Sequence, residues 1–342
     1  MTATIDLRSD TVTRPTQAMQ EAMWKAPVGD DVFKEDPSLN ELEKKAAQMF
    51  GMEAALFCPS GTMTNQIAIK VHTVPGEEVI CHALSHIYNY EGGGVAFNSG
   101  CQVRLTHGPK GLMTAPEVEA LVQNPNDIHA APSRLVVAEN TTNKGGGACY
   151  ELEDLRAIRE VCDHHGLSFH LDGARLWNAL VAKNQEPQDY GAIFHSISIC
   201  LSKGLGCPVG SLLLGSQEFI TKARRIRKRM GGGMRQAGYL AAAGIYALDH
   251  HIERLAEDHQ KAQSLKEALE HCAWVDRVEP VETNIVIFYL KEGKSAEAFS
   301  KMLAKHHILH TAMGQGKLRF VPHLDVSSEQ IAAVCQVLQN MT

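Results

Sequence analysis

The chain has 342 residues, of which 44% are hydrophobic, so it can build a large core and more than one domain. Its 33 basic and 39 acidic residues leave a formal net charge of −6, which argues against nucleic acid as a partner. No segment is apolar enough over a sufficient length to cross a membrane, and the early charged residues argue against a signal peptide.

The nine cysteines include no C-x-x-C pair, and many of them lie inside apolar runs. An odd number of such thiols is typical of a reducing compartment, because disulfides persist only under oxidising conditions. We therefore expect free thiols and a cytoplasmic location.

Short apolar runs alternate with helical patterns in the first part of the chain. Strands are predicted at 54–58, 79–81, 134–139 and within 167–175. Residues 151–166 predict a helix, since aliphatic residues recur there at helical spacing and Gly166 ends the pattern. This alternation predicts an α/β fold with a mostly parallel sheet and ligands at the carboxyl ends of its strands.

The pattern changes in the second part. Strands at 195–201 and 211–215 flank a glycine-rich bend, and a helical region with a break follows at 235–273. The tail then predicts strand, helix, strand and helix, which suggests a small α/β domain. We expect a large domain over residues 1–248 and a small one over 249–342.

Ser60, Gly61 and Thr62 stand between a predicted strand and a predicted helix. The N-terminus of a helix offers unpaired N–H groups and the positive end of a dipole, so this position can hold a phosphate. The alternative is that Ser60 or Thr62 only caps the helix.

Lys203 lies in the bend "CLSKGLGCPVGSLLLG", which spans residues 200–215. Its glycines only distantly resemble a dinucleotide-binding loop, since the spacing differs and a strand follows instead of a helix. A lysine at such a place is either solvated or directed at a ligand, and an unprotonated lysine can form a Schiff base.

Asp172 in "HLDGAR" comes just after the strand predicted within 167–175. It could cap a helix, or it could place a carboxylate at the ligand edge of the sheet. Pyridoxal phosphate (PLP) needs a lysine for its aldehyde, a carboxylate for its ring nitrogen and a cup for its phosphate. Lys203, Asp172 and residues 60–62 together offer all three.

The chain resembles the L-threonine aldolases, of the low-specificity and L-allo-threonine types, which belong to the β-eliminating lyase family. The motifs that carry the resemblance cover nearly the whole chain: "IDLRSDTVTRPT", "VGDDVFKEDPSLNELE", "PSGTMTNQIA", "SHIYNYE", "HLDGARLWNA", "SICLSKGLGCPVGSLL" and "GGGMRQAG". The resemblance implies the aspartate-aminotransferase fold, which is PLP fold type I, with a seven-stranded sheet. It also implies cleavage of L-threonine or L-allo-threonine to glycine and acetaldehyde.

The family's site residues carry over to this chain as follows. Cofactor contacts would come from Lys203, Ser60, Gly61, Thr62, His86, Asp172 and Arg175. Lys203 would bind the aldehyde carbon of PLP, and Asp172 would pair with its ring nitrogen. Substrate contacts would come from Ser9, Arg175 and Arg319, which would bind the carboxylate. His86 would be the general base, with His129 or a water molecule as alternatives.

The resemblance further implies a homodimer that assembles into a homotetramer. Arg235, in "GGGMRQAG", would reach the phosphate site of the neighbouring subunit, with Lys228 nearby. Without the resemblance, the basic run at 222–229 is best interpreted as a solvated helix face.

Three departures from the family's usual pattern concern the pocket: "ENTTN" at 139–143, Phe33 and Pro322. They bear on pocket shape and stereochemical preference.

Two other functions compete with the aldolase. One is a different PLP-dependent lyase or racemase with the same fold. The other is a homologue that binds PLP without catalysis, although such a protein would need no base.

Overall fold

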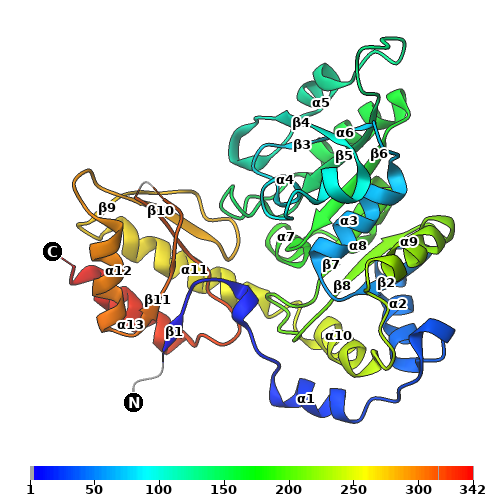
Figure 1. Ribbon diagram of the computed structural model, residues 1–342. Coiled ribbons are helices and arrows are strands. Elements are labelled where there is room, and N and C mark those ends of the chain that lie inside the picture. The colour runs from blue at the N-terminus through cyan, green and yellow to red at the C-terminus, as the bar shows by residue number, and fades with distance from the viewer. Residues whose placement is uncertain (1–3, 315, 342) are drawn as a thin grey trace.

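A seven-stranded sheet forms the centre of the large domain in the computed structural model, which describes residues 4–314 and 316–341 (Figure 1). The strand order is β2-β8-β7-β6-β5-β3-β4. The strands are β2 (Ala54–Cys58), β3 (Glu78–His82), β4 (Gln102–Thr106), β5 (Ser133–Glu139), β6 (Ser168–Gly173), β7 (Ser196–Cys200) and β8 (Ser211–Gly215). Six strands of this sheet run in the same direction, and β8 runs opposite to them. The sheet is therefore mostly parallel, and the predicted α/β fold class is confirmed.

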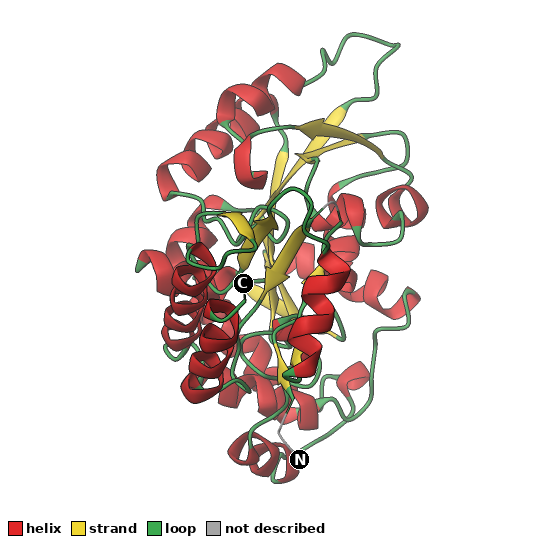
Figure 2. Ribbon diagram, turned by 90° about the vertical axis from the view of Figure 1, so that its left-hand side faces the viewer, coloured by secondary structure: helices red, strands yellow, loops and turns green. Residues whose placement is uncertain are grey.

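Helices lie on both sides of the sheet (Figure 2). Those of the large domain are α1 (Gln17–Trp24), α2 (Pro37–Met49), α3 (Gly61–His72), α4 (His86–Asn89), α5 (Ala115–Leu121), α6 (Leu152–His165), α7 (Leu176–Lys183), α8 (Pro187–Ile193), α9 (Gln217–Arg229) and α10 (Gly238–His250). The predicted helix at 151–166 is α6, which buries Leu155 and Ile158 and ends at Gly166 with a φ of 65°. Within the described residues, no helix has both the length and the apolar composition that a membrane span requires.

The small domain has a core of its own. Its elements are α11 (Leu255–Glu270), β9 (Val275–Val278), β10 (Val286–Leu290), α12 (Ala296–Lys305), β11 (Ile308–Leu309), β12 (Thr311–Ala312), β13 (Lys317–Phe320) and α13 (Ser328–Gln339). A four-stranded antiparallel sheet, in the order β12-β13-β10-β9, packs on the helices through Phe288, Phe299 and Phe320. Helix α11 joins the two cores, since Leu255 packs in the large domain and Leu265 in the small one.

The N-terminal segment connects the small domain to the bend that carries Lys203. Strand β1 (Ile5–Asp6) pairs in parallel with β11, and Figure 1 shows it among the small-domain elements. Leu7 lies in the small-domain core. Further along, the Thr13 hydroxyl donates to the Lys203 carbonyl over 2.8 Å. The division at residue 249 stays a prediction, but residues 5–7 pack with the small domain.

The glycine-rich bend follows β7 and returns the chain into β8, as predicted. The Gly206 N–H donates to the Lys203 carbonyl over 2.8 Å, which closes a tight turn directly after the lysine. Gly206 has a φ of 77°, and a Cβ there would lie 2.8 Å from Leu324 Cδ2. Both facts require glycine, because a side chain would be strained and would clash.

Candidate active site

One cavity of about 290 Å³ lies at the carboxyl ends of β6 and β7 and the start of α3. The predicted residues that line it are Ser60, Gly61, Thr62, His86, Asp172 and Lys203. They come from four separate stretches of the sequence, and the fold brings them to one edge of the sheet. A larger cavity of about 430 Å³ between α2 and α9 contains none of the predicted site residues.

The start of α3 forms one wall of this cavity. Ser60 is the N-cap, and its hydroxyl accepts from the Met63 N–H over 3.2 Å, so the capping interpretation is correct for Ser60. A Cβ on Gly61 would lie 2.7 Å from Cys200 Sγ. Glycine at this position therefore lets α3 begin directly against the end of β7. Capping and ligand binding are compatible, because the first N–H groups of a helix have no acceptor within it.

Asp172 is buried at the end of β6. One carboxylate oxygen accepts from Asn65 Nδ2 over 2.9 Å, and the other accepts from the Ala174 N–H over 3.2 Å. The next helix, α7, has Arg175 as its N-cap residue. The alternative interpretation of Asp172 as a helix cap is therefore wrong.

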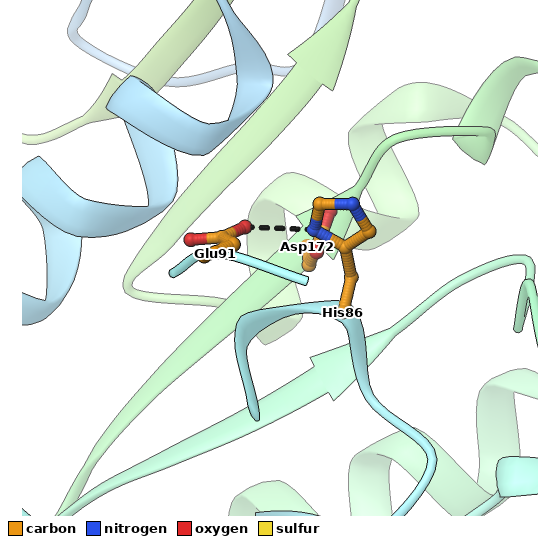
Figure 3. Close-up of side chains that lie close together, drawn as sticks. All are labelled: His86, Glu91 and Asp172. Atoms are coloured by element: carbon orange, nitrogen blue, oxygen red, sulfur yellow. Dashed lines mark hydrogen bonds and ion pairs between the residues drawn. The ribbon is translucent and has the colours of Figure 1, made fainter. Parts of the chain in front are cut away.

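His86, Glu91 and Asp172 lie close together, and the first and the last of them line the cavity (Figure 3). His86 Nδ1 lies 2.9 Å from Glu91 Oε1. Asn65 Nδ2 donates to the same Glu91 oxygen over 3.0 Å, and it also donates to Asp172. Ligand atoms of the three residues lie within 4.8 Å of one another, a spacing that would also suit a metal ion. The Asn65 amide accounts for the close approach of the two carboxylates, because it bridges them.

Charge around His86 shifts two pKa values. Burial lowers the pKa of His86, but the hydrogen bond to Glu91 and the negative charges of Asp172, Glu91 and Glu139 outweigh it, so the net shift is upward. Burial, together with the charge of Asp172, raises the pKa of Glu139 to about 7. His86 therefore holds its proton more tightly than a free histidine does.

The Lys203 side chain is half-buried and lines the cavity. Its Nζ lies 3.8 Å from the thiol of Cys200, and Ser211 donates to that thiol over 3.2 Å. The backbone bonds to Thr13 and Gly206 fix the lysine's position at the end of β7. The lysine side chain therefore lines a cavity, and its binding to a ligand there stays a prediction.

The arginines Arg175 and Arg319 meet at a single amide. Arg319 Nη1 donates to Asn143 Oδ1 over 2.9 Å, and Arg175 Nη1 donates to the same oxygen over 3.4 Å. Arg175 also binds Asp10 through two hydrogen bonds of 2.8 and 2.6 Å. Burial raises the pKa of Asp10, but Arg175 and Lys203 hold it well below its usual range. Ser9 precedes this aspartate and is the N-cap of the short helix η1 (Asp10–Val12).

Sequence reasoning missed the roles of Asp10, Asn65, Glu91, Glu139 and Asn143. Several of them lie inside the quoted motifs, but polar residues in loops and at strand ends gave no signal that they contact one another. The contacts join residues that are far apart in the chain: 165 positions separate Asp10 from Arg175, and 176 separate Asn143 from Arg319.

Six predicted residues do not line the cavity within one chain. Ser9, Arg175 and Arg319 lie next to it, beside Asp10 and Asn143, whereas His129, Lys228 and Arg235 lie further away. His129 lies in the loop before β5, at the opposite end of that strand from the cavity, and its side chain is 86% exposed. Its Nδ1 contacts Asp127. Lys228 is exposed on α9, and Arg235 is 57% exposed and pairs with Asp30 over 2.9 Å. Within one chain, His129 therefore lies away from His86, because the length of β5 separates its loop from the cavity, and its role as an alternative base stays a prediction.

A mostly parallel seven-stranded sheet, a small α/β domain and a lysine after a central strand define the architecture of PLP fold type I. Solved structures agree with this class. Threonine aldolase from Leishmania major superposes with a TM-score of 0.84 at 22% identity, covering 98% of each chain. A putative L-allo-threonine aldolase from Listeria monocytogenes gives 0.82 at 23% identity, covering 98% of this chain and 95% of the other. At such identities the likeness shows the fold alone.

Sequence comparison assigns the family. The sequence model of the β-eliminating lyases matches residues 6–293, and this chain belongs to that family. It is 44% identical to the low specificity L-threonine aldolase of Escherichia coli K12, over 96% of this chain and 97% of the relative. It is 41% identical to low-specificity L-threonine aldolase 1 of Arabidopsis thaliana, over 96% and 93% of the two chains. The resemblance seen in the motifs is therefore confirmed.

Proposed function

We propose that this protein is a PLP-dependent aldolase that cleaves L-threonine and L-allo-threonine to glycine and acetaldehyde. The observation that carries the proposal is the common cavity of Lys203, Asp172 and the start of α3. The names of the relatives at 41% and 44% identity support the same reaction.

The donor set of the cavity fits PLP. Lys203 offers an amine for the aldehyde, and buried Asp172 offers a carboxylate that favours a protonated ring nitrogen. The start of α3 offers N–H groups for the phosphate. When bound, PLP withdraws electrons from Cα of the amino acid and so stabilises the negative charge that remains when the Cα–Cβ bond breaks.

Two arginines and Asn143 supply a place for the substrate carboxylate. Arg319 Nε is buried and has no partner among the described atoms, so this guanidinium keeps an unused donor. Nη1 of each arginine donates to Asn143 Oδ1, and this shared acceptor holds the two like charges close together. A carboxylate bound there would be oriented by charge-assisted hydrogen bonds. Ser9 would add a hydroxyl next to Asp10.

His86 is the proposed base for the β-hydroxyl proton. Glu91 can accept only from a protonated Nδ1, so the neutral ring carries its proton there and keeps Nε2 as an acceptor. A positioned general base typically contributes about 10²–10⁴-fold. A water molecule is one alternative. His129 is the other, and it would have to come from another subunit.

Arg235 and Lys228 support an oligomeric enzyme. Both are exposed on one chain and lie outside its cavity. We propose that in a homodimer, paired into a homotetramer, Arg235 reaches the phosphate bound at α3 of the neighbouring subunit.

All nine cysteines are unpaired, which supports the proposed cytoplasmic location.

The test combines spectroscopy with product analysis, and Lys203→Ala is the matched control. The wild type with PLP should show the absorbance of a lysine-bound cofactor and should release acetaldehyde from L-threonine. Lys203→Ala should lose both signals and the bond that borohydride traps. Elimination or racemisation without acetaldehyde would favour another lyase or a racemase. A bound cofactor without any turnover would favour a non-catalytic homologue.

A further inference from the structure

The carboxylate of Glu139 joins the two halves of the candidate site. It lies at the end of β5, directly opposite Asp172 on β6, and its side chain is buried. Oε2 accepts from the backbone N–H of His86 over 2.6 Å, and Oε1 accepts from the backbone N–H of Asn143 over 2.7 Å. One residue therefore binds the backbone beside the proposed base and the backbone beside the arginine pair.

The His86 contact replaces a local helix cap. His86 begins α4, and Ser85 before it makes no capping hydrogen bond with its side chain. The first N–H of α4 instead donates to Glu139, which is 53 residues away in sequence. A residue of β5 thus helps to hold the backbone of His86, in addition to the hydrogen bonds within its own loop.

The Asn143 contact leads to the arginines. Glu139 holds the Asn143 backbone, and the Asn143 side chain accepts from Arg319 and Arg175. Arg319 comes from β13 of the small domain, whereas Arg175 follows β6 of the large domain. The Asn143 side chain is therefore the acceptor that the two guanidinium groups share.

We propose that Glu139 is a positioning residue that sets the separation between His86 and the carboxylate-binding arginines by bonding to both backbone amides. This inference rests on the proposed function for the roles of His86 and the arginines. It assigns Glu139 no contact with the substrate. It keeps the base and the carboxylate site at fixed positions relative to the sheet.

Glu139→Gln removes this double acceptor with little change in shape. A glutamine has one acceptor oxygen and one NH₂ group, so one of the two backbone N–H groups would face another donor. At a pH above the raised pKa of Glu139, where its carboxylate is charged, we expect the affinity for glycine, measured by the change in cofactor absorbance, to fall about tenfold, as for the loss of one hydrogen bond to a charged group. We also expect kcat for L-threonine to fall.

Glu78→Gln is the matched control. Glu78 is a buried carboxylate at the start of β3, away from the cavity edge, and it accepts from Arg104 and Gln102 over 2.9 Å each. Its loss should lower Tm while glycine affinity and kcat stay unchanged. If Glu139→Gln behaves in the same way, with only a lower Tm, Glu139 is a structural residue and the proposal is wrong.

A double-mutant cycle with Asn143→Ala tests the route through Asn143. The loss of glycine affinity in the double variant should be no larger than in Asn143→Ala alone, because both changes remove the same link. Losses that add would overturn the proposal. Should Glu139→Gln fail to fold, Asn143→Ala alone still decides, since unchanged glycine affinity would show that the link has no effect on the site.

A crystal structure of Glu139→Gln gives a readout that does not depend on turnover. Either Asn143 should move away from Arg319, or His86 should move at the start of α4. A wild type that does not cleave threonine would refute the proposed function, even if these displacements were seen. An active aldolase in which neither residue moves would refute only the role of Glu139.

Discussion

Asp10 and Arg175 form a buried ion pair in which both carboxylate oxygens accept from one guanidinium group, over 2.8 and 2.6 Å. Both residues lie in the region of the proposed carboxylate site, and Asn284 of the small domain donates to the same aspartate over 3.1 Å. The pair leaves Arg175 Nη1 directed at Asn143. The aspartate therefore orients the arginine and neutralises it.

Asp10→Asn should be strongly destabilising. Removing one partner of a buried ion pair leaves the other charge uncompensated, which typically lowers the free energy of unfolding by about 3–5 kcal/mol. Chemical denaturation measures this loss. The exposed pair Glu218–Lys222 is the control, and Glu218→Gln should leave stability unchanged. Equal stability of Asp10→Asn and wild type would mean that Arg175 finds another partner.

The ion pair also predicts how stability depends on pH. The pKa of Asp10 is lower in the folded than in the unfolded protein. Its contribution to stability is therefore full above the unfolded pKa of about 3.9 and is lost as pH falls toward the folded value. The free energy of unfolding of Asp10→Asn should not contain this contribution at any pH, so it should fall less than that of the wild type as the pH is lowered. Acid unfolding of the two proteins measures the difference.

Asp172→Asn should retain the fold and lose most of the cleavage activity. A neutral amide no longer favours a protonated ring nitrogen, and each pKa unit lost there corresponds to about 1.4 kcal/mol. Circular dichroism checks the fold, and kcat with L-threonine checks the chemistry. An unchanged kcat would show that the carboxylate does not act on the cofactor.

Glu91→Gln should move the acidic limb of the kcat/KM profile to lower pH. Glu91 contributes to the raised pKa of His86, so removing its charge lowers that pKa. The ring then loses its proton at a lower pH. Glu119→Gln is the control, because Glu119 contacts His165 over 2.8 Å at the surface. An acidic limb that does not move would point to water, or to His129 of another subunit, as the base.

Arg235→Ala should weaken cofactor affinity without altering the chemistry at Lys203. Mixing this variant with Lys203→Ala under limiting PLP should restore part of the activity. Hybrid dimers would then contain one site with Lys203 intact and Arg235 supplied by the other subunit. No recovery, despite proven subunit exchange, would place Arg235 outside the neighbouring site.

Local sequence patterns predicted most of the fold. Apolar runs gave the central strands, and the aliphatic spacing with Gly166 gave α6, because these signals depend on residues close in the chain. They did not reveal β4, whose polar residues form a partly exposed edge strand, or β1 and β11, which have two residues each. Strands of this kind are held by pairing with a partner rather than by their own pattern.

The sequence by itself also determined the chemical groups of the site. Lys203 in a glycine-rich bend, Asp172 at a strand end and residues 60–62 at a helix start could each be placed from their neighbours. The family motifs then supplied His86 and the arginines. What the sequence left open was whether Ser60 and Asp172 were caps.

Only the tertiary structure decided how these groups are held. Ser60 proved to be a cap and Asp172 did not, because each outcome depends on where the next helix begins. The partners of the site residues, Asp10, Asn143 and Glu139, come from elements far apart in the chain. Hydrogen bonds and ion pairs require contact in space, and side chains that meet only after the chain has folded leave no local pattern.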